Sequence, residues 1–433
     1  MAIQALMIIL VVLAVLLVLG VPISYAIGIS SLAAIVQVMP LDVAVLTAAQ
    51  RTFVGMSKFS LTAIPFFILA GNLMNQGGIA KRLVDFVMAI LGKCPGALLV
   101  TNVGANALFG AISGSASAAA AAVGSMVREG EVEQGYDPAI CAATNAASAP
   151  SGLLIPPSNA LITYSLAAGG TSVAALFMAG YVPGIIWAVM CAVVAIIIAK
   201  KKGYTGTPGK FDWASLGRAT IAALPSLSLI IVVIGGIVAG IFTATEGSAI
   251  AVVYALLLGI IYKNITLKSF WNIVVDSAKM SGMVGFLIGV SNILGWVMAF
   301  TQIPQAVSAA LLGITSNKYA ILLIMNVILL VAGTFMDVTP AILIFTPLFL
   351  PIVKTFGMHS VQFGLILVYN LCIGNITPPV GNTLFVGIKV GKTSLGEVMP
   401  YMLMYYAAIL AGLLLVTYVP FVSLGLPTAA GLI

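Results

Sequence analysis

Long apolar runs separated by short polar breaks make up most of the chain. Because a membrane-spanning helix needs roughly 20 mostly apolar residues, the spacing of the breaks predicts about ten to twelve crossing or half-crossing helices. The stretch from Ala2 to Gly20 has no basic region and no small-residue cleavage site, so we expect a first transmembrane helix there and not a secretory peptide. The pattern therefore predicts an all-α integral membrane protein.

Composition supports this class and excludes others. Hydrophobic residues make up 61% of the 433 positions and charged residues 7%, which leaves too little polar surface to coat a soluble body. Lipid is expected to cover most of the molecule. The net charge of +7 comes from Lys and Arg scattered through short loops, with no aromatic-interleaved basic patch, so a nucleic-acid partner is not expected.

Side chains suited to covalent chemistry or to transition metals are scarce. The four cysteines are widely spaced without a CxxC pair, and we interpret them as small core residues: Cys94, Cys141, Cys191 and Cys372. The single histidine, His359, lies in a loop-like stretch and is expected to be exposed. An intramembrane enzyme would need a nucleophile and base or a metal cluster, so enzymatic function is not expected.

Charge distribution predicts how the chain is divided. The one strongly polar internal stretch, residues 200–218, reads as a cytoplasmic linker between segments 1–199 and 219–433, because it is rich in Lys and Arg. The first fifty residues and everything after Glu397 contain no Lys or Arg, so both termini are expected outside. Each segment then crosses an odd number of times, which predicts two repeats inverted relative to each other.

Recurring features support the duplication independently. The two segments share five features, and every pair is separated by the same distance along the sequence: Pro156-Pro157 with Pro378-Pro379, Gly152 with Gly374, Ser115 with Asp337, Ser117 with Thr339, and residues 21–24 with 243–246. One constant offset thus relates the two segments.

The first break in each repeat is a short polar turn inside an apolar stretch. Residues 112–117 form a hydroxyl-rich turn whose flanking arms are too short to cross a membrane comfortably, which predicts a re-entrant hairpin near 98–127. Its counterpart is predicted near 319–354, with Asp337 between two threonines. A carboxylate in an apolar run is a functional candidate by default. An alternative, compatible interpretation is that Asp337 caps the helix that begins at Pro340.

The second break in each repeat carries tandem prolines. Such prolines remove amide donors and interrupt a helix, so broken helices are predicted near 138–168 and 361–390. Discontinuous helices at matching positions of inverted halves are typical of transporter sites, where helix N-termini attract anions and unwound carbonyls coordinate cations. The alternative is a proline kink that simply packs against its neighbours.

These motifs together resemble a known transporter family. The runs 333–352 (GTFMDVTPAILIFTPLFLPI) and 240–256 (GIFTATEGSAIAVVYAL), with the two proline pairs, are similar to the large membrane subunit of tripartite ATP-independent periplasmic (TRAP) transporters. The resemblance covers essentially the whole chain. Ala244 stands where the family usually has proline, which makes the helix start there less certain, and Glu246 matches the family's glutamate, as a helix-start carboxylate or a member of an ion pair.

The resemblance implies an elevator-type carrier in the bacterial inner membrane. A mobile transport domain would contain the two hairpins and the two broken helices, and a Na⁺ gradient would drive uptake. The implied partners are a small membrane subunit and a periplasmic substrate-binding protein, and the implied substrate is an organic acid such as sialic acid or a C4-dicarboxylate. No ATP-binding loop of the GxxxxGK[ST] type occurs in the sequence.

Candidate ion and substrate sites follow from the breaks. Hard oxygen ligands suit Na⁺. The first ion site is expected at Ser113, Ser115, Ser117, Gly152, Ile155 and Pro156, and the second at Thr334, Asp337, Thr339, Gly374, Thr377 and Pro378. The acid should lie between the hairpin tips, with five polar candidates to line the space: Asn145, Ser151, Asn159, Asn375 and Asn382.

Two other kinds of transport protein would use similar elements. A channel also uses re-entrant segments, but a hairpin and a broken helix in each repeat favour alternating access. A stand-alone Na⁺/dicarboxylate symporter of related architecture is the closer alternative. Transport that requires a binding protein would distinguish the TRAP interpretation from both.

Overall fold

A computed structural model describes residues 2–206 and 212–433, and within these ranges all regular structure is helical. The first half contains α1 (Ala2–Val18), α2 (Ile23–Ile35), α3 (Leu41–Met56), the 3₁₀ helix η1 (Phe59–Thr62), α4 (Ala63–Gln76), α5 (Ile79–Leu91), α6 (Ala97–Ser113), α7 (Ala116–Glu133), α8 (Pro138–Ser148), α9 (Ser151–Leu154), α10 (Asn159–Ala167) and α11 (Val173–Lys202). The middle of the expected linker, residues 207–211, lies outside the described residues.

The second half of the chain is also helical. It contains α12 (Trp213–Val238), α13 (Ala244–Ile261), α14 (Leu267–Phe300), α15 (Ile303–Ile314), α16 (Lys318–Phe335), α17 (Val338–Thr355), α18 (Ser360–Gly374), α19 (Asn382–Gly391), α20 (Leu395–Tyr418) and α21 (Pro420–Ala429). The starts of α17, α18 and α20 follow those of α7, α8 and α11 by one constant distance along the chain. This distance is the offset that the sequence motifs share.

Helix length and hydropathy identify a multi-pass membrane protein. Among the described residues, seven helices are long and apolar enough to cross a bilayer, and an eighth span is formed if α3 and α4, bent by 60°, count as one. Five shorter apolar helices of 10–17 residues accompany them, which agrees with the expected ten to twelve crossing or half-crossing segments. The arms of the second hairpin, α16 and α17, are longer than expected, at 18 residues each.

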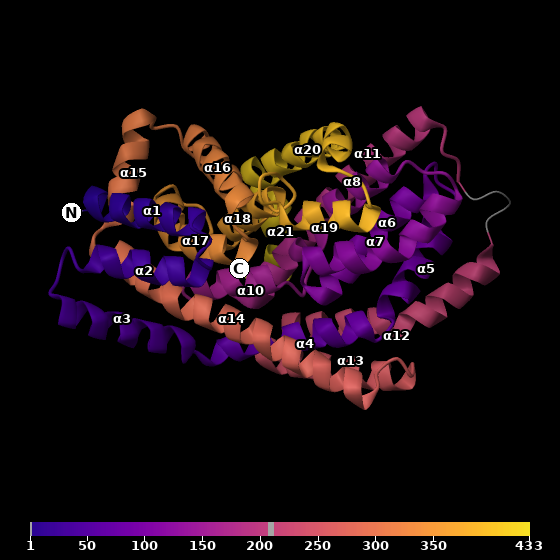
Figure 1. The fold of residues 1–433 in the computed structure, drawn as a ribbon, viewed down its shortest axis with the longest axis horizontal. Helices are drawn as coiled ribbons and strands as arrows, with labels where there is room; N and C mark the ends of the chain where they lie inside the picture. The colour runs from indigo at the N-terminus through magenta and orange to yellow at the C-terminus, as the bar shows by residue number, and fades with distance from the viewer. Residues whose placement is uncertain (1, 207–211) are drawn as a thin grey trace.

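The helices form a peripheral group and a central group (Figure 1). We define the peripheral group as α1–α4 and α12–α14, and the central group as α6–α11 and α16–α21. In Figure 1, α14 runs diagonally through the lower part of the molecule, beside α3 and α4. The Asn72 amide donates to the Ser277 hydroxyl at 2.8 Å and joins α4 to the N-terminal half of α14. Helices α5 and α15 link the two groups along the chain.

Glycine contacts pack the hairpins against the broken helices. A Cβ atom at Gly152 would lie 2.2 Å from the Cα atom of Gly110, and one at Gly374 would lie 2.3 Å from the carbonyl carbon of Gly333. Real Cβ atoms do not come so close to backbone, so each contact requires glycine. The two hairpins and their broken helices therefore meet backbone to backbone.

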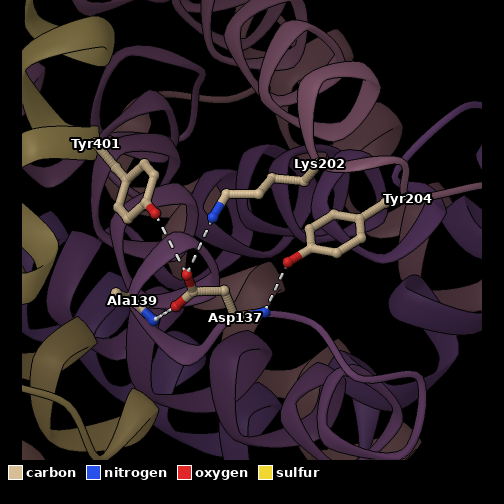
Figure 2. A network of polar contacts seen from close by, with 5 residues as sticks. All are labelled: Asp137, Ala139, Lys202, Tyr204 and Tyr401. Atoms are coloured by element: carbon tan, nitrogen blue, oxygen red, sulfur yellow. Dashed lines mark hydrogen bonds and ion pairs between the residues drawn. The ribbon is translucent and has the colours of Figure 1, made fainter.

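A polar network fixes the start of α8 at the linker side of the molecule (Figure 2). The Asp137 carboxylate accepts a hydrogen bond from the Ala139 N–H at 3.0 Å and thereby caps α8. The Lys202 ammonium lies 3.7 Å from the same carboxylate, and the Tyr401 hydroxyl donates to it at 3.3 Å. The Asp137 N–H donates to the Tyr204 hydroxyl at 2.9 Å. The network joins the end of α11 to helices from both halves of the chain.

The glycine contacts predict that an added methyl group lowers stability at the tight contact but not at an exposed helical glycine. Gly152→Ala should lower the stability of the protein by about 1–3 kcal/mol, because the methyl group overpacks the contact with Gly110. The control is Gly217→Ala, in exposed α12, where nothing lies within 4 Å and alanine favours the helix. Thermal unfolding of the purified proteins in detergent measures both effects. Equal melting temperatures for the two variants would contradict the tight contact.

Candidate functional site

The turns of the two hairpins are stabilised by polar caps. Gly114 ends α6 with a positive φ of 64°, and Ser115 then caps α7 by accepting a hydrogen bond from the Ala118 N–H at 3.3 Å. In the second half the Asp337 carboxylate accepts from the Val338 N–H at 2.9 Å and caps α17. Asp337 is therefore a helix cap, as the alternative interpretation expects, but the helix begins at Val338 and not at Pro340.

The broken helices are interrupted at the tandem prolines, and both proline pairs are joined by cis peptide bonds. Side chains supply partners for carbonyls near each break. The Ser158 hydroxyl donates to the Leu153 carbonyl, and the Tyr406 hydroxyl donates to the Ile376 carbonyl at 2.6 Å. The Thr377 hydroxyl donates to the Ile373 carbonyl at 2.7 Å. Carbonyl groups near both breaks are thus satisfied by hydroxyl groups of the central group.

The hairpin tips and the breaks surround one cavity of about 250 Å³, which we call the tip cavity. Seven of the predicted site residues line it: Ser115, Ser117, Asn159, Asp337, Thr339, Asn375 and Asn382. The opposite wall belongs to the peripheral helices α4 and α14 and is apolar, with Ile64, Ile68 and Met283 among its residues. The cavity therefore has one polar wall contributed by both halves and one apolar wall.

The polar wall of the tip cavity belongs to the central group, and polar side chains lie close to the hairpin tips there. Asn382 and Asp337 both line the cavity, and Asp337 is exposed there. A Cβ atom at Gly114 would lie 2.8 Å from the Asn159 amide nitrogen, so the first tip lies directly against this asparagine. The Asn159 Oδ1 atom is buried and has no hydrogen-bond partner. This oxygen is available to a ligand or water at the cavity.

Two predicted substrate residues do not line the tip cavity. The Asn145 amide donates to the Ala120 carbonyl at 2.8 Å, and its Oδ1 accepts from Asn106 at 3.0 Å. The Ser151 hydroxyl donates to the Ser148 carbonyl at 2.7 Å. Both side chains are buried and tie the first broken helix to the first hairpin or to itself. Asn106 was not singled out in the sequence, although it lies four residues after Asn102 in an apolar helix.

The other predicted ion ligands do not line the tip cavity. Gly152 and Gly374 form the backbone contacts already described. The Thr334 hydroxyl donates to the Val331 carbonyl at 2.8 Å, while its own carbonyl accepts from the Val380 N–H at 3.1 Å. Ser113, Ile155, Pro156 and Pro378 are not among the residues that line the cavity.

The donor atoms in these regions are hydroxyl, carboxylate, amide and carbonyl oxygens. Such a set fits a hard cation. Within the described ranges no cluster of three His, Cys, Asp or Glu side chains is present that could hold a metal ion.

Glu246 lies away from the tip cavity. Its carboxylate accepts hydrogen bonds from the Thr243 N–H at 2.8 Å and from the Thr243 hydroxyl at 2.9 Å, which forms a capping box at the start of α13. In the described residues the two ion pairs involve Asp137 and Asp276, so Glu246 acts as a helix-start carboxylate. Although Ala244 stands where the family usually has proline, α13 begins at this residue with its capping box intact.

Comparison with known proteins gives consistent matches across the chain. The family model "Tripartite ATP-independent periplasmic transporter, DctM component" matches residues 10–422. YgiK of Salmonella typhimurium is 49% identical over 415 residues, 96% of this chain and 95% of that protein. The C4-dicarboxylate TRAP transporter large permease DctM of Rhodobacter capsulatus is 37% identical, over 95% of this chain and 96% of its own length.

Two further matches extend the comparison. The sialic acid TRAP transporter large permease SiaM of Vibrio cholerae is 35% identical, over 79% of this chain and 80% of its own length. Among solved structures, the YdaH transporter of Alcanivorax borkumensis superposes with a TM-score of 0.61 and 14% identity, over 84% of this chain and 87% of that chain. At that identity the likeness concerns the fold alone.

The tip cavity predicts a pattern of thiol reactivity. In a Cys94→Ser background, Thr339→Cys should react with a hydrophilic maleimide at least about tenfold faster than Ser151→Cys, because Thr339 lines the cavity and Ser151 is buried. The remaining native cysteines are buried and provide a low background. Labelling rates of the purified protein in detergent measure the difference. Similar rates at the two positions would contradict the cavity as described.

Proposed function

Because the chain belongs to the DctM component family of tripartite ATP-independent periplasmic transporters, we propose that it takes up an organic acid by Na⁺-coupled secondary transport. The chain is a multi-pass membrane transport protein and not an enzyme. The acid would be delivered by a periplasmic binding protein, and a small membrane subunit would complete the complex. Both partners are implied by the family.

The observation that carries the proposal is the convergence of four helix starts on the tip cavity. The first residues of α7, α10, α17 and α19 all line it or adjoin its lining. The N-terminus of a helix presents unpaired N–H groups and a partial positive charge, so four such ends favour an anion at their meeting point. Discontinuous helices aimed in this way at a carboxylate are typical of secondary transporters.

Two inverted repeats and an elevator movement are the architecture that we propose. The recurrence of helix starts at one constant offset supports the duplication. The central group would be the transport domain, because it contains both hairpins and both broken helices, and the peripheral group would be the scaffold. The boundaries would be residues 1–199 and 219–433, joined by the linker 200–218.

Sodium coupling is proposed from the chemistry of the breaks. Asp337, Thr339 and their hydroxyl-bearing counterparts Ser115 and Ser117 provide hard oxygen ligands beside unwound backbone. A cation between an acidic substrate and Asp337 would also offset the repulsion between the two negative charges. We propose one ion site in each half, at the residues that the sequence identifies.

The orientation that we propose has both termini in the periplasm. We assign the turns between helices to two faces of the molecule by the contacts between them. On one face the Asn264 amide donates to the Gly77 carbonyl, and Lys202 pairs with Asp137. This face carries most of the Lys and Arg residues among the described helix ends, including Lys81, Lys93, Lys200, Lys201, Lys268 and Lys392. Lys318, at the start of α16, and Lys354, near the end of α17, are exceptions: they lie on the opposite face, at the open end of the second hairpin. The positive-inside rule assigns the Lys-rich face to the cytoplasm.

The substrate class is proposed from the relatives. Their names refer to C4-dicarboxylates and to sialic acid, which are both carboxylates. A stand-alone Na⁺/dicarboxylate symporter of related architecture is the second candidate, and the fold likeness to a transporter, YdaH, is compatible with it. Dependence on the binding protein discriminates the two.

Reconstitution tests the proposal directly. The chain and its small subunit would be placed in proteoliposomes with an inward Na⁺ gradient and supplied with labelled succinate or sialic acid, each free or loaded on its binding protein. We expect uptake of one acid only when both Na⁺ and the loaded binding protein are present. Uptake of free acid at the same rate would favour the stand-alone symporter, and uptake without Na⁺ would contradict sodium coupling.

Asp337 provides a sharper test of the ion site. Asp337→Asn retains a side-chain oxygen that can cap α17 but removes the charge, so we expect uptake to fall at least ~10-fold while assembly with the small subunit is unchanged. Asp337→Ala should lose uptake and also destabilise the hairpin. The control is Asp276→Asn, an exposed carboxylate on α14. Normal sodium dependence in Asp337→Asn would remove this residue from the site.

A further inference from the structure

A second cavity, of about 260 Å³, lies between the peripheral and central groups. Its peripheral wall includes Arg51 near the C-terminal end of α3, Lys58 just before η1, and Trp296 on α14. Its central wall includes Gly169 after α10 and Pro347 on α17. We call it the scaffold cavity.

Two uncompensated cations distinguish the scaffold cavity. Its lining contains Arg51 and Lys58 but no carboxylate, and neither side chain forms an ion pair within the described residues. The Arg51 guanidinium lies over the Trp296 ring, 5.4 Å from its centroid. Both cations lie in the bent α3–α4 segment, which has the length and hydropathy of a membrane span. Cations at such a position require an anionic partner or water, and this makes them functional candidates.

The wall that carries these cations is tightly packed. A Cβ atom at Gly55 would lie 2.5 Å from the Asn292 amide nitrogen, and one at Gly289 would lie 2.7 Å from the Met56 Cγ. These contacts hold the end of α3 against α14 between the two cations. Arg51 and Lys58 are therefore mounted on a fixed part of the peripheral group, as a binding site requires.

The tip cavity and the scaffold cavity are lined by successive segments of the same two helices, α14 and α17. On α14 the tip cavity is lined by Met280 to Val284 and the scaffold cavity by Ile288 to Trp296. The centres of these segments are about ten residues apart, which corresponds to roughly 15 Å along a helix. On α17 the lining likewise moves from Val338 to Pro347. Sliding the central group along α14 by this distance would bring the hairpin tips to the cations.

We propose that Arg51 and Lys58 form an outer anion site, which binds the carboxylate of the transported acid when the central group is raised toward the periplasm. The inference rests on the proposed transport function and adds a site on the scaffold to it. In the proposed orientation the start of α3 and the end of α14 face the periplasm. Arg51 lies ten residues from the start of α3 and Trp296 four residues from the end of α14, which would place the site on the periplasmic side.

The wall that faces the tip cavity in the present conformation has a different character. Ile64, Ile68, Met280 and Met283 offer no charge to an anion. An acid that moves with the hairpin tips from the outer position to the inner position therefore loses both cations. The scaffold then favours capture outside and release inside, through a difference in affinity between the two states.

Substitutions that remove the charges test the outer anion site in the reconstituted complex. Arg51→Gln and Lys58→Gln should each raise the half-saturating concentration of loaded binding protein roughly five- to tenfold, whereas Arg51→Lys should retain most of the affinity. The matched control is Lys354→Gln, an exposed outer cation that does not line the cavity. The probe is the labelled acid for which the unsubstituted complex shows uptake.

Fluorescence quenching tests the charge of the cavity without transport. Replacing the exposed Trp213 and Trp271 by Phe leaves Trp296 and the fully buried Trp187. Each quenching constant is first divided by the constant for free tryptophan. By this ratio the anion iodide should quench Trp296 more strongly than neutral acrylamide does, because the two cations attract it. The double variant Arg51→Gln, Lys58→Gln should lose this preference for iodide. The acrylamide response reports whether the double variant is folded.

The outcomes separate the two proposals. Wild-type half-saturation in the double variant, or an unchanged iodide preference, would overturn the outer anion site. Reduced uptake with an unchanged iodide preference would also overturn it, because the cations would then act outside the cavity, for example on the small subunit. Absence of uptake by the unsubstituted complex would overturn the proposed function itself.

Discussion

Backbone groups inside a membrane must find their hydrogen-bond partners within the protein, because no water is available in the hydrocarbon. This constraint governs the four places where the central helices are interrupted. Ser115 and Asp337 satisfy N–H groups at the hairpin tips, and Ser158 and Tyr406 satisfy carbonyls at the proline breaks. The interruptions are stable because each has such a partner. They bring polar atoms to one cavity that a set of continuous helices could not form.

Much of this arrangement could be predicted from the sequence. The hairpins, the broken helices and the recurrence of motifs at a constant offset follow from prolines, glycines and hydroxyl groups within apolar runs, since these residues have few other uses in lipid. Seven of the predicted site residues line the tip cavity. The capping role of Asp337 was also foreseeable, because a carboxylate before a helix has a preferred geometry.

Other features depend on contacts between distant segments, which local patterns do not encode. Asn145 and Ser151 resemble site residues in composition, but the fold turns them toward Ala120 and Ser148, away from the cavity. In the sequence Arg51 and Lys58 look like ordinary topology charges, and only the fold places them at a cavity that α14 and α17 also line. Hydropathy alone also does not separate a full crossing from a shorter apolar helix packed within the protein, so the sequence could not divide the expected segments into the seven long and five shorter apolar helices of the described residues.

The contacts Gly110–Gly152 and Gly333–Gly374 limit how the tip cavity can open. A hairpin that swung away as a hinged lid would have to separate backbones that meet without any side chain between them. Such a motion would expose amide and carbonyl groups and leave a void in the middle of the bilayer. Each hairpin is thus locked to its broken helix, so under the proposed elevator movement the two would have to shift together as one body past the peripheral helices.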